Sequence, residues 1–332
     1  MQPRFFMCRG LELRTYLARR LLLSIPTLFG LTVLIFGAMR VLPGGGLGAF
    51  VVDDMVSQQL TDVQIQAIKR ELGLDRPLHV QYYTWIRDVF DGSFGYSQSR
   101  AGEPIRDLIL SRGIISAEIG ILAVLLSWVI GLPVGMLSAI KPNSIWDKLA
   151  STTTVLFLAL PNFWLGLLII LCWVVFWGYH PPVVGVNPWV DPVANFKIII
   201  GPTLVMATSM AAVIARMARS SLFEVLRQDY VKTAKSKGLA ERVVIARHVL
   251  PNALMPVLTI SGVMLGFVMG GSVAVEVAFT TPGLGRSIVQ ATIERDMNVV
   301  QSLVLLYGMI FILVNFIIDL LYSVLDPRVR MS

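Results

Sequence analysis

The chain has 332 residues, of which 55% are hydrophobic and only 15% are charged, and its formal net charge at neutral pH is +7. Length alone would suggest two soluble domains, but a mean hydropathy of +0.71 and long charge-free runs exclude them. Because the positive charge is concentrated in segments expected on one side of a membrane, we expect no nucleic-acid partner.

Six charge-free runs are each close to, or longer than, the ~20 apolar residues that a helix needs to cross a lipid bilayer. They are Leu21–Met39, Ile119–Ile140, Leu149–Val190, Ile198–Ala215, Val249–Val275 and Met297–Ile318. The sequence therefore predicts an all-α polytopic membrane protein with six transmembrane helices. Five arginines precede the first run and no A-x-A-like cleavage site follows it, so we expect a retained span that enters from the cytoplasm.

Residues 47–112 are polar and form too long a connection to lack structure of their own. Thr61-Asp62-Val63-Gln64 fits a capping box at the start of a helix that Gly73 would end, and a second amphipathic segment covers residues 77–92. We predict an extracytoplasmic helical insertion between the first two spans, within an N-terminal unit of residues 1–112. Its aromatic residues fit two interpretations: packing on the membrane domain, and a platform for an external partner.

Three residues within or beside the apolar runs are candidates to line a translocation pathway. Glu118 lies at the outer end of the second span, Asn162 follows a proline inside the long third run, and Met264 lies in the fifth span. A polar break inside a span is tolerated where it lines a cavity. A paired or interfacial acid at Glu118 and a simple helix kink at Asn162 are the competing interpretations.

The fifth span is rich in glycine, and Gly262, Gly266 and Gly270 recur on one helix face, which permits close approach of another helix. Residues 276–296, with several charges and the sequence Pro-Gly-Leu-Gly, are expected to form an outer loop.

The sixth span is expected at Met297–Leu321, so that residues 113–325 make one transmembrane domain and residues 326–332 a cytoplasmic tail. Six spans place both termini in the cytoplasm, and the basic residues near both ends agree with that orientation.

The segment 216–248 separates two of the apolar runs and carries eight lysines and arginines but only three acids. Eight such residues inside lipid would cost about 20 kcal/mol or more, so this segment lies outside the bilayer. A basic excess in a short loop is typical of the cytoplasmic side.

Inside this segment, residues 230–237 have the pattern of a short helix. Tyr230 and Ala234 share one face, Lys232 and Lys235 share another, and Gly238 is expected to end the helix with a positive φ. Pro251 then opens the next span. A short cytoplasmic helix tied to two spans would transmit force from a partner to both of them.

The stretch Asp229-Tyr230-Val231-Lys232-Thr233-Ala234-Lys235-Ser236-Lys237-Gly238, followed by Leu250-Pro251, resembles the EAA loop of permease subunits of bacterial ABC importers. In that register Lys232, Thr233 and Ala234 take the E-A-A positions and His248 takes the isoleucine position. The sequences Gly92-Ser93-Phe94-Gly95 and Pro282-Gly283-Leu284-Gly285 also resemble the dipeptide and oligopeptide branch. Pro43-Gly44-Gly45 departs from that branch, which usually has Pro-Gly-Asp.

The resemblance implies the type I ABC importer permease fold and a non-catalytic subunit of an importer in the bacterial inner membrane. Its implied partners are a second homologous permease, two cytoplasmic ATP-binding subunits that hold ATP and magnesium, and an extracytoplasmic substrate-binding protein. No cofactor or metal is expected in this chain. The implied ATPase-coupling residues are Arg227, Asp229, Tyr230, Lys232, Thr233, Ala234, Lys237, Gly238, His248 and Pro251.

Peptides are the cargo that the resemblance implies, with nickel complexes or glutathione as alternatives. A secondary transporter driven by an ion gradient would be expected to carry charges deep within its spans, which the apolar runs lack. A membrane-embedded enzyme would need convergent acids, histidines or cysteines. The three histidines, His79, His180 and His248, are instead dispersed along the chain.

Overall fold

A computed structural model of the chain describes residues 4–41, 63, 66, 70, 73, 75–100 and 102–325. Several predictions lie outside these residues: the turn at 43–45, most of the first helix expected after the capping box at 61–64, and the tail at 326–332. The surroundings of Gly270 lie outside them as well.

The described residues form helices and connecting turns, with one isolated bridge between Tyr96 and Pro104. In chain order the helices are α1 (Arg4–Val41), α5 (Leu78–Phe90), α6 (Ile105–Ile140), α7 (Ile145–Ala159), α8 (Asn162–Trp177), α9 (Pro192–Leu226), α10 (Asp229–Ser236), α11 (Glu241–Val244), the π-helical turn η1 (Ile245–Val249), α12 (Leu250–Ala278), α13 (Leu284–Ile293) and α14 (Met297–Leu325). The all-α prediction is confirmed.

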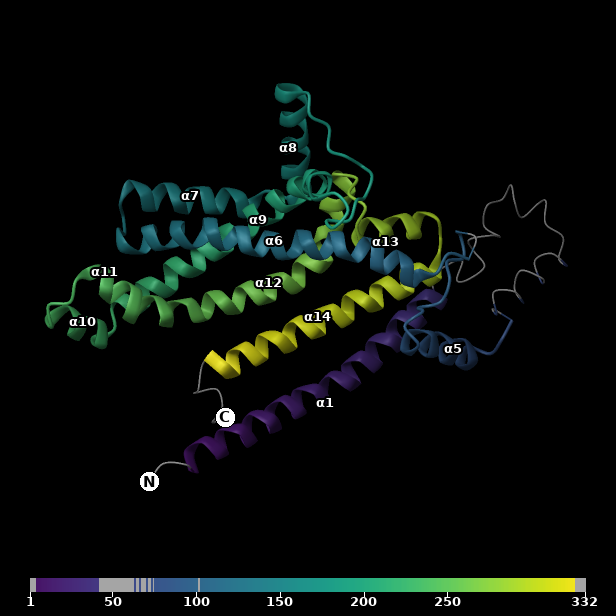
Figure 1. Ribbon diagram of the computed structural model, residues 1–332, viewed down its shortest axis with the longest axis horizontal. Coiled ribbons are helices and arrows are strands. Elements are labelled where there is room, and N and C mark those ends of the chain that lie inside the picture. The colour runs from purple at the N-terminus through teal and green to yellow at the C-terminus, as the bar shows by residue number, and fades with distance from the viewer. Residues whose placement is uncertain are drawn as a thin grey trace.

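Five helices are long and apolar enough to cross a membrane, and the bent pair α7 and α8 makes a sixth candidate span. The two halves of that pair meet at an angle of 102°, at the break that Pro161 introduces. Figure 1 shows α8 standing away from the bundle while α7 runs beside α6. The long uncharged run therefore holds two helices that meet at a sharp bend, followed by the connection to α9.

The centre of the bundle is α9, which packs along α6 over most of its length. Two glycines of α6 make this close approach possible. A Cβ atom at Gly131 would lie 2.7 Å from the carbonyl oxygen of Ala211, and one at Gly135 would lie 2.5 Å from that of Ala215. Small residues at a helix interface let backbones approach within a membrane, where lipid offers no hydrophobic gain.

The glycine face predicted for the fifth span is confirmed at two of its positions. Side-chain atoms of Ile318 on α14 occupy the space that a Cβ atom at Gly262 would need, and Phe311 does the same at Gly266. Helices α12 and α14 therefore lie in close contact along this face.

The bundle has two distinct ends (Figure 1). Helices α10 and α11 lie at one, which we name the α10 end and which comprises residues 227–249. The other, the α13 end, comprises residues 92–104 and 280–296 and also carries α5. Helix α1 begins and α14 ends toward the α10 end.

Helix α9 continues unbroken beyond the apolar run to Leu226, so it includes Arg216 and Arg219 of the charged segment. Arg219 donates two hydrogen bonds to Asp147 of α7, at 2.7 and 2.9 Å. Asp147 is almost fully buried, and it also accepts a bond from the backbone N–H of Asn143. This pair allows a basic helix end to continue against α7, which charge counting along the chain could not anticipate.

The predicted outer loop at 276–296 is wrong at its start, because α12 continues to Ala278 and Glu276 lies inside it, fully buried. The boundary set between residues 112 and 113 falls inside α6, which begins at Ile105. The second amphipathic segment of the insertion is confirmed as α5.

Candidate functional site

The short helix predicted in the charged segment is present as α10. Gln228 precedes it with extended backbone, and Asp229 places an acid in its first turn, where the helix dipole favours negative charge. Lys237 and Gly238 end it, and Gly238 has the predicted positive φ, at +77°. No atom would lie within 4 Å of a Cβ added at Gly238, so glycine is needed there for its backbone conformation alone.

One face of α10 is held by apolar packing. Val231 is fully buried and Ala234 nearly so. They belong to a cluster supplied by α6, α9, α10, α11, η1 and α12: Ala139, Ile214, Ala218, Leu222, Val231, Ala234, Val244, Val249, Ala253 and Val257. Ala234, one of the implied coupling residues, faces the chain's own core. It seats the helix.

A small polar network joins α10 to the start of α12. The side-chain amide of Asn252 donates to the hydroxyl of Tyr230 at 3.1 Å and to the carbonyl of His248 at 2.9 Å. That carbonyl lies in the π-helical turn, where the regular helical hydrogen-bond pattern is interrupted. His248 thus acts through its backbone, and Asn252 is a structural partner that sequence reasoning did not identify.

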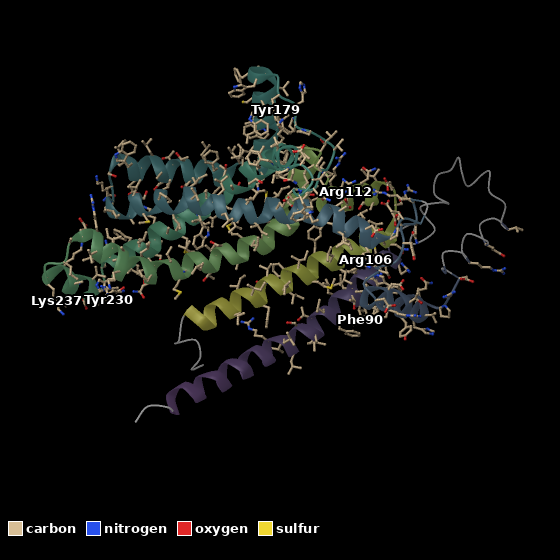
Figure 2. The ribbon with its side chains drawn as sticks, viewed as in Figure 1. Phe90, Arg106, Arg112, Tyr179, Tyr230 and Lys237 are labelled. Atoms are coloured by element: carbon tan, nitrogen blue, oxygen red, sulfur yellow. The ribbon has the colours of Figure 1, made fainter. Side chains whose placement is uncertain are left out.

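The opposite face of α10 is polar and exposed. It presents Lys232, Thr233 and Lys235, all exposed, and Lys237 follows directly. Figure 2 shows Tyr230 and Lys237 at this end of the bundle. Lys232 forms an exposed ion pair with Asp229 at 2.8 Å, and its hydrogen bond holds the pKa of that carboxyl below its usual range. The exposed face is therefore basic, and it has no apolar partner among the described residues.

The flanks of α10 are restrained on both sides. The guanidinium of Arg227 lies 4.0 Å from the ring centroid of Phe223 on α9, in a cation–π contact. Pro251 occupies the first turn of α12, where its missing N–H costs no helical hydrogen bond. The hydroxyl of Ser221 donates to the carbonyl of Ala253, which joins α9 to α12 directly. A push on α10 would therefore reach two long helices.

The three pathway candidates each contact other residues of the bundle. Asn162 opens α8 at the sharp bend and accepts a hydrogen bond from Ser209 of α9. Glu118 accepts one from Asn195 at 3.0 Å, and Met264 packs against the core cluster between α6, α9 and α12. Each of the two polar candidates thus has a partner within the chain.

A buried carboxylate organises the α13 end. Glu276 of α12 is fully buried and accepts hydrogen bonds from Ser116 of α6, Ser272 and the backbone N–H of Arg286. Arg286 lies in the first turn of α13, where backbone N–H groups have no partner within the helix. The Glu276 carboxylate accepts one of these N–H groups and is favoured there by the helix dipole. An added Cβ atom at Gly283 would overlap the Glu276 side chain, which explains the glycine of the Pro-Gly-Leu-Gly turn.

A second buried acid ties the segment before α6 to the α13–α14 connection. Asp296 accepts hydrogen bonds from the hydroxyl of Ser99 at 2.9 Å and from the backbone N–H groups of Gln98 and Ser99 at 2.9 and 3.1 Å. Nearby, Arg100 forms an ion pair with Glu294 at 3.1 Å. These contacts join residues almost two hundred positions apart.

Sequence reasoning placed both acids in an exposed loop and missed their roles. The usable signal at Glu276 was an acid at the end of an apolar run, followed by a turn with two glycines. Such a turn leaves room for a carboxylate against a helix start, but the sequence does not say which acid fills it.

Comparisons with known proteins match this architecture. The family model "Binding-protein-dependent transport system inner membrane component" matches residues 131–331, and the corresponding N-terminal model matches residues 13–105. The oligopeptide transport system permease protein AppB of Bacillus subtilis is 37% identical over 95% of this chain and 99% of its own length. The glutathione transport system permease protein GsiC of Salmonella typhimurium is 36% identical over 95% of this chain and 98% of its own length.

Among solved structures, an inward-facing form of the MetNI methionine ABC transporter matches with a TM-score of 0.57 and 20% identity. The match covers 68% of this chain and 99% of the chain in that structure. At this identity the likeness concerns the fold alone, and it agrees with the type I ABC importer permease fold.

Proposed function

The chain belongs to the family of binding-protein-dependent transport system inner membrane components, and on that premise we propose that it forms half of the translocation pathway of an ATP-driven peptide importer. A second, homologous permease would supply the other half. The likeness to the oligopeptide permease over nearly the whole length of both chains supports peptides as the cargo class.

The observation that carries the proposal is the construction of α10. Its inner face is buried against α9, α11 and α12, while its outer face is basic and exposed. A helix of eight residues is barely stable alone, so its packing against the rest of the chain is what holds it in place. This packing leaves the basic face open to a partner. We infer that this face docks on a cytoplasmic ATP-binding subunit, through Tyr230, Lys232, Thr233 and Lys237.

The proposed orientation follows from the charges. The α10 end would lie in the cytoplasm together with both termini, and the α13 end with α5 would face the outside of the bacterial inner membrane. Two ATP-binding subunits would bind and hydrolyse ATP with magnesium, and this chain would convert their closure into movement of α9 and α12. An extracytoplasmic binding protein would deliver cargo to the α13 end.

Glutathione is the second candidate cargo, because a glutathione permease is nearly as similar to this chain as the oligopeptide permease. Glutathione is itself a small peptide with free carboxylates, so both candidates share the chemistry that the transporter would have to recognise.

Uptake measurements test the proposal. A strain that lacks this chain should lose ATP-dependent uptake of radiolabelled di- to hexapeptides or of glutathione, and a plasmid copy should restore it. An ionophore that collapses the ion gradient while ATP is maintained should leave uptake in place. Uptake that survives the deletion, or that follows the ion gradient and not ATP, would contradict the proposed function.

A further inference from the structure

A cavity of about 360 Å³ lies at the α13 end, beside the first turns of α6. Its floor is formed by Arg112 and Ile115, and its other wall is the connection between α8 and α9, including Gly185 and Asn187. Figure 2 shows Arg112 near the outer end of α6, below α8, while Arg106 lies farther along the same helix.

The connection is held firmly over α6. A Cβ atom at Gly185 would lie 2.9 Å from Pro282 and 3.2 Å from Ile115, so only glycine fits this approach without displacing a neighbour. The side-chain amide of Asn195 donates to the carbonyl of Val186 and to the carboxylate of Glu118, each at 3.0 Å. The cavity is therefore preformed, and Glu118 helps to hold its wall.

The polar groups of this cavity include two donors without a partner among the described residues. Arg112 is half-buried but makes no ion pair or hydrogen bond there, and the side-chain amide of Asn187 makes no hydrogen bond there. Burial lowers the pKa of Arg112, the charges of Arg100 and Arg286 lower it further, and the charge of Glu103 opposes them. Arg100 already pairs with Glu294. A half-buried guanidinium beside two other cations favours an anion.

The position of Arg112 excludes the hydrocarbon core. The charge-free part of α6 begins at Ile119, and seven residues of helix add about 10 Å beyond it. The interfacial layer on one side of a bilayer is only ~5–8 Å thick, so the guanidinium reaches the water above the lipid headgroups. Helical side chains also lean toward the N-terminus, which here is farther outward. A water-soluble anion is thus a better partner for it than a lipid phosphate.

We propose that Arg112 and Asn187 form a binding site for a carboxylate of the peptide cargo on the outer side of the bundle. The inference rests on the proposed function, since peptides and glutathione both carry such groups. The planar guanidinium pairs with both oxygens of a carboxylate, and the amide of Asn187 can donate one further hydrogen bond. The nearby Glu103 disfavours anions of higher charge, such as inorganic phosphate.

Chemical protection tests this site without relying on transport. The complete transporter in lipid nanodiscs is treated with phenylglyoxal, which modifies accessible guanidinium groups, and the rate at each arginine is read by mass spectrometry. Trialanine at ten times its Kd should slow modification of Arg112 about tenfold, because only about one site in eleven is then unoccupied. Trialanine amide and inorganic phosphate should have little effect. Arg106, exposed on the same helix and outside the cavity lining, is the internal control.

Several results would overturn the inference. These are equal protection by trialanine and its amide, protection by phosphate alone, and protection by the binding protein without any peptide. A guanidinium at Arg112 that does not react even without peptide would mean that another subunit already covers it.

Uptake of the two probes then separates this inference from the proposed function. Arg112→Gln should reduce uptake of the free acid and leave the amide unchanged, Arg112→Lys should restore part of the difference, and Arg106→Gln should change neither. Abundance in the membrane, measured by immunoblot, identifies a variant that fails to fold. In that case the protection of Arg112 in the wild-type chain decides whether the carboxylate site exists. If peptide uptake needs this chain but Arg112 is never protected, only the carboxylate site fails.

Discussion

The two ends of the bundle are stabilised in different ways. At the α10 end a short helix packs through Val231 and Ala234 on apolar side chains such as Val244, and its lysines face outward. At the α13 end Glu276 and Asp296 are buried and bind several donors each. The first arrangement leaves a charged surface free for a partner. The second joins α6, α12, α13 and α14 to one another at that end.

The difference suggests a division of labour between the ends. Apolar contacts are non-directional and tolerate small shifts, so we expect the seat of α10 to adjust at the cost of only a few hydrogen bonds, such as those of Asn252. Buried carboxylates need several aligned donors and tolerate displacement poorly. The α13 end would therefore move as one block during the transport cycle.

The largest effect is expected from removing the carboxylate at the centre of the α13 end. Glu276→Ala leaves Ser116, Ser272 and the first turn of α13 without their acceptor, which should destabilise the protein by about 3 kcal/mol or more. Thermal unfolding of the detergent-solubilised protein measures the change. Glu224→Ala, which removes an exposed acid of α9, is the control and should have almost no effect. Equal losses in both variants would contradict the proposed block.

A smaller and more local effect is expected at the second buried acid. Asp296→Ala removes the acceptor for Ser97, Gln98 and Ser99 and should cost about 2 kcal/mol. The segment before α6 would then open more often, so trypsin should cut faster after Arg100. Asp107→Ala, an exposed acid in the first turn of α6, should leave that cleavage rate unchanged. An unchanged rate in Asp296→Ala would show that other contacts hold the segment.

At the α10 end a backbone change should affect coupling more than stability. Valine at Gly238 must adopt a positive φ, which costs roughly 1–3 kcal/mol, and relief of this strain would displace the end of α10. Gly238→Val should therefore lower transport per ATP hydrolysed while the protein remains in the membrane. Gly238→Asn is the matched control, because asparagine tolerates this conformation far better than valine. Equal coupling in the two variants would argue against a role for this helix end.

The smallest effect concerns the ion pair between Arg100 and Glu294. Burial alone would raise the pKa of Glu294, but hydrogen bonds from Gln290, Arg100 and Ser99 outweigh it, and the pKa lies below its ordinary value of 4.5. The carboxylate therefore stabilises the fold above that pH, and the stabilisation is lost as the pH falls through the folded-state value. The melting temperature of Glu294→Gln should be slightly lower than wild type near neutral pH, for a loss of about 0.5 kcal/mol. The two should converge as the pH falls through the folded-state pKa of Glu294, and a difference that grows in acid would contradict this sign.

The sequence predicted the α10 end far better than the α13 end, and the reason is physical. A run of lysines cannot enter lipid, so local composition alone located Lys232 and Lys235, and Gly238 marked the end of the helix. The role of Glu276 depends on Ser116, which is 160 positions away in the chain. Local sequence predicts that an acid near the end of an apolar run is exposed, because the distant hydrogen-bond donors that allow its burial are known only from the fold.

Two other features show the same limit. The basic end of α9 continues beyond the apolar run, and Arg219 there pairs with Asp147, which is 72 positions away in the chain. The sharp angle between α7 and α8 was foreshadowed by the proline before Asn162, but local sequence does not set its size.

The most direct test of the account is a crosslink from α10. In a chain whose two cysteines, Cys8 and Cys172, are replaced by serine, Lys235→Cys should form a crosslink to the cytoplasmic ATP-binding subunit in the assembled transporter. Its thiol should be labelled only from the cytoplasm, and Arg106→Cys at the other end should give no such crosslink. Labelling of residue 235 from outside intact cells, or ATP hydrolysis by this chain purified alone, would contradict the account.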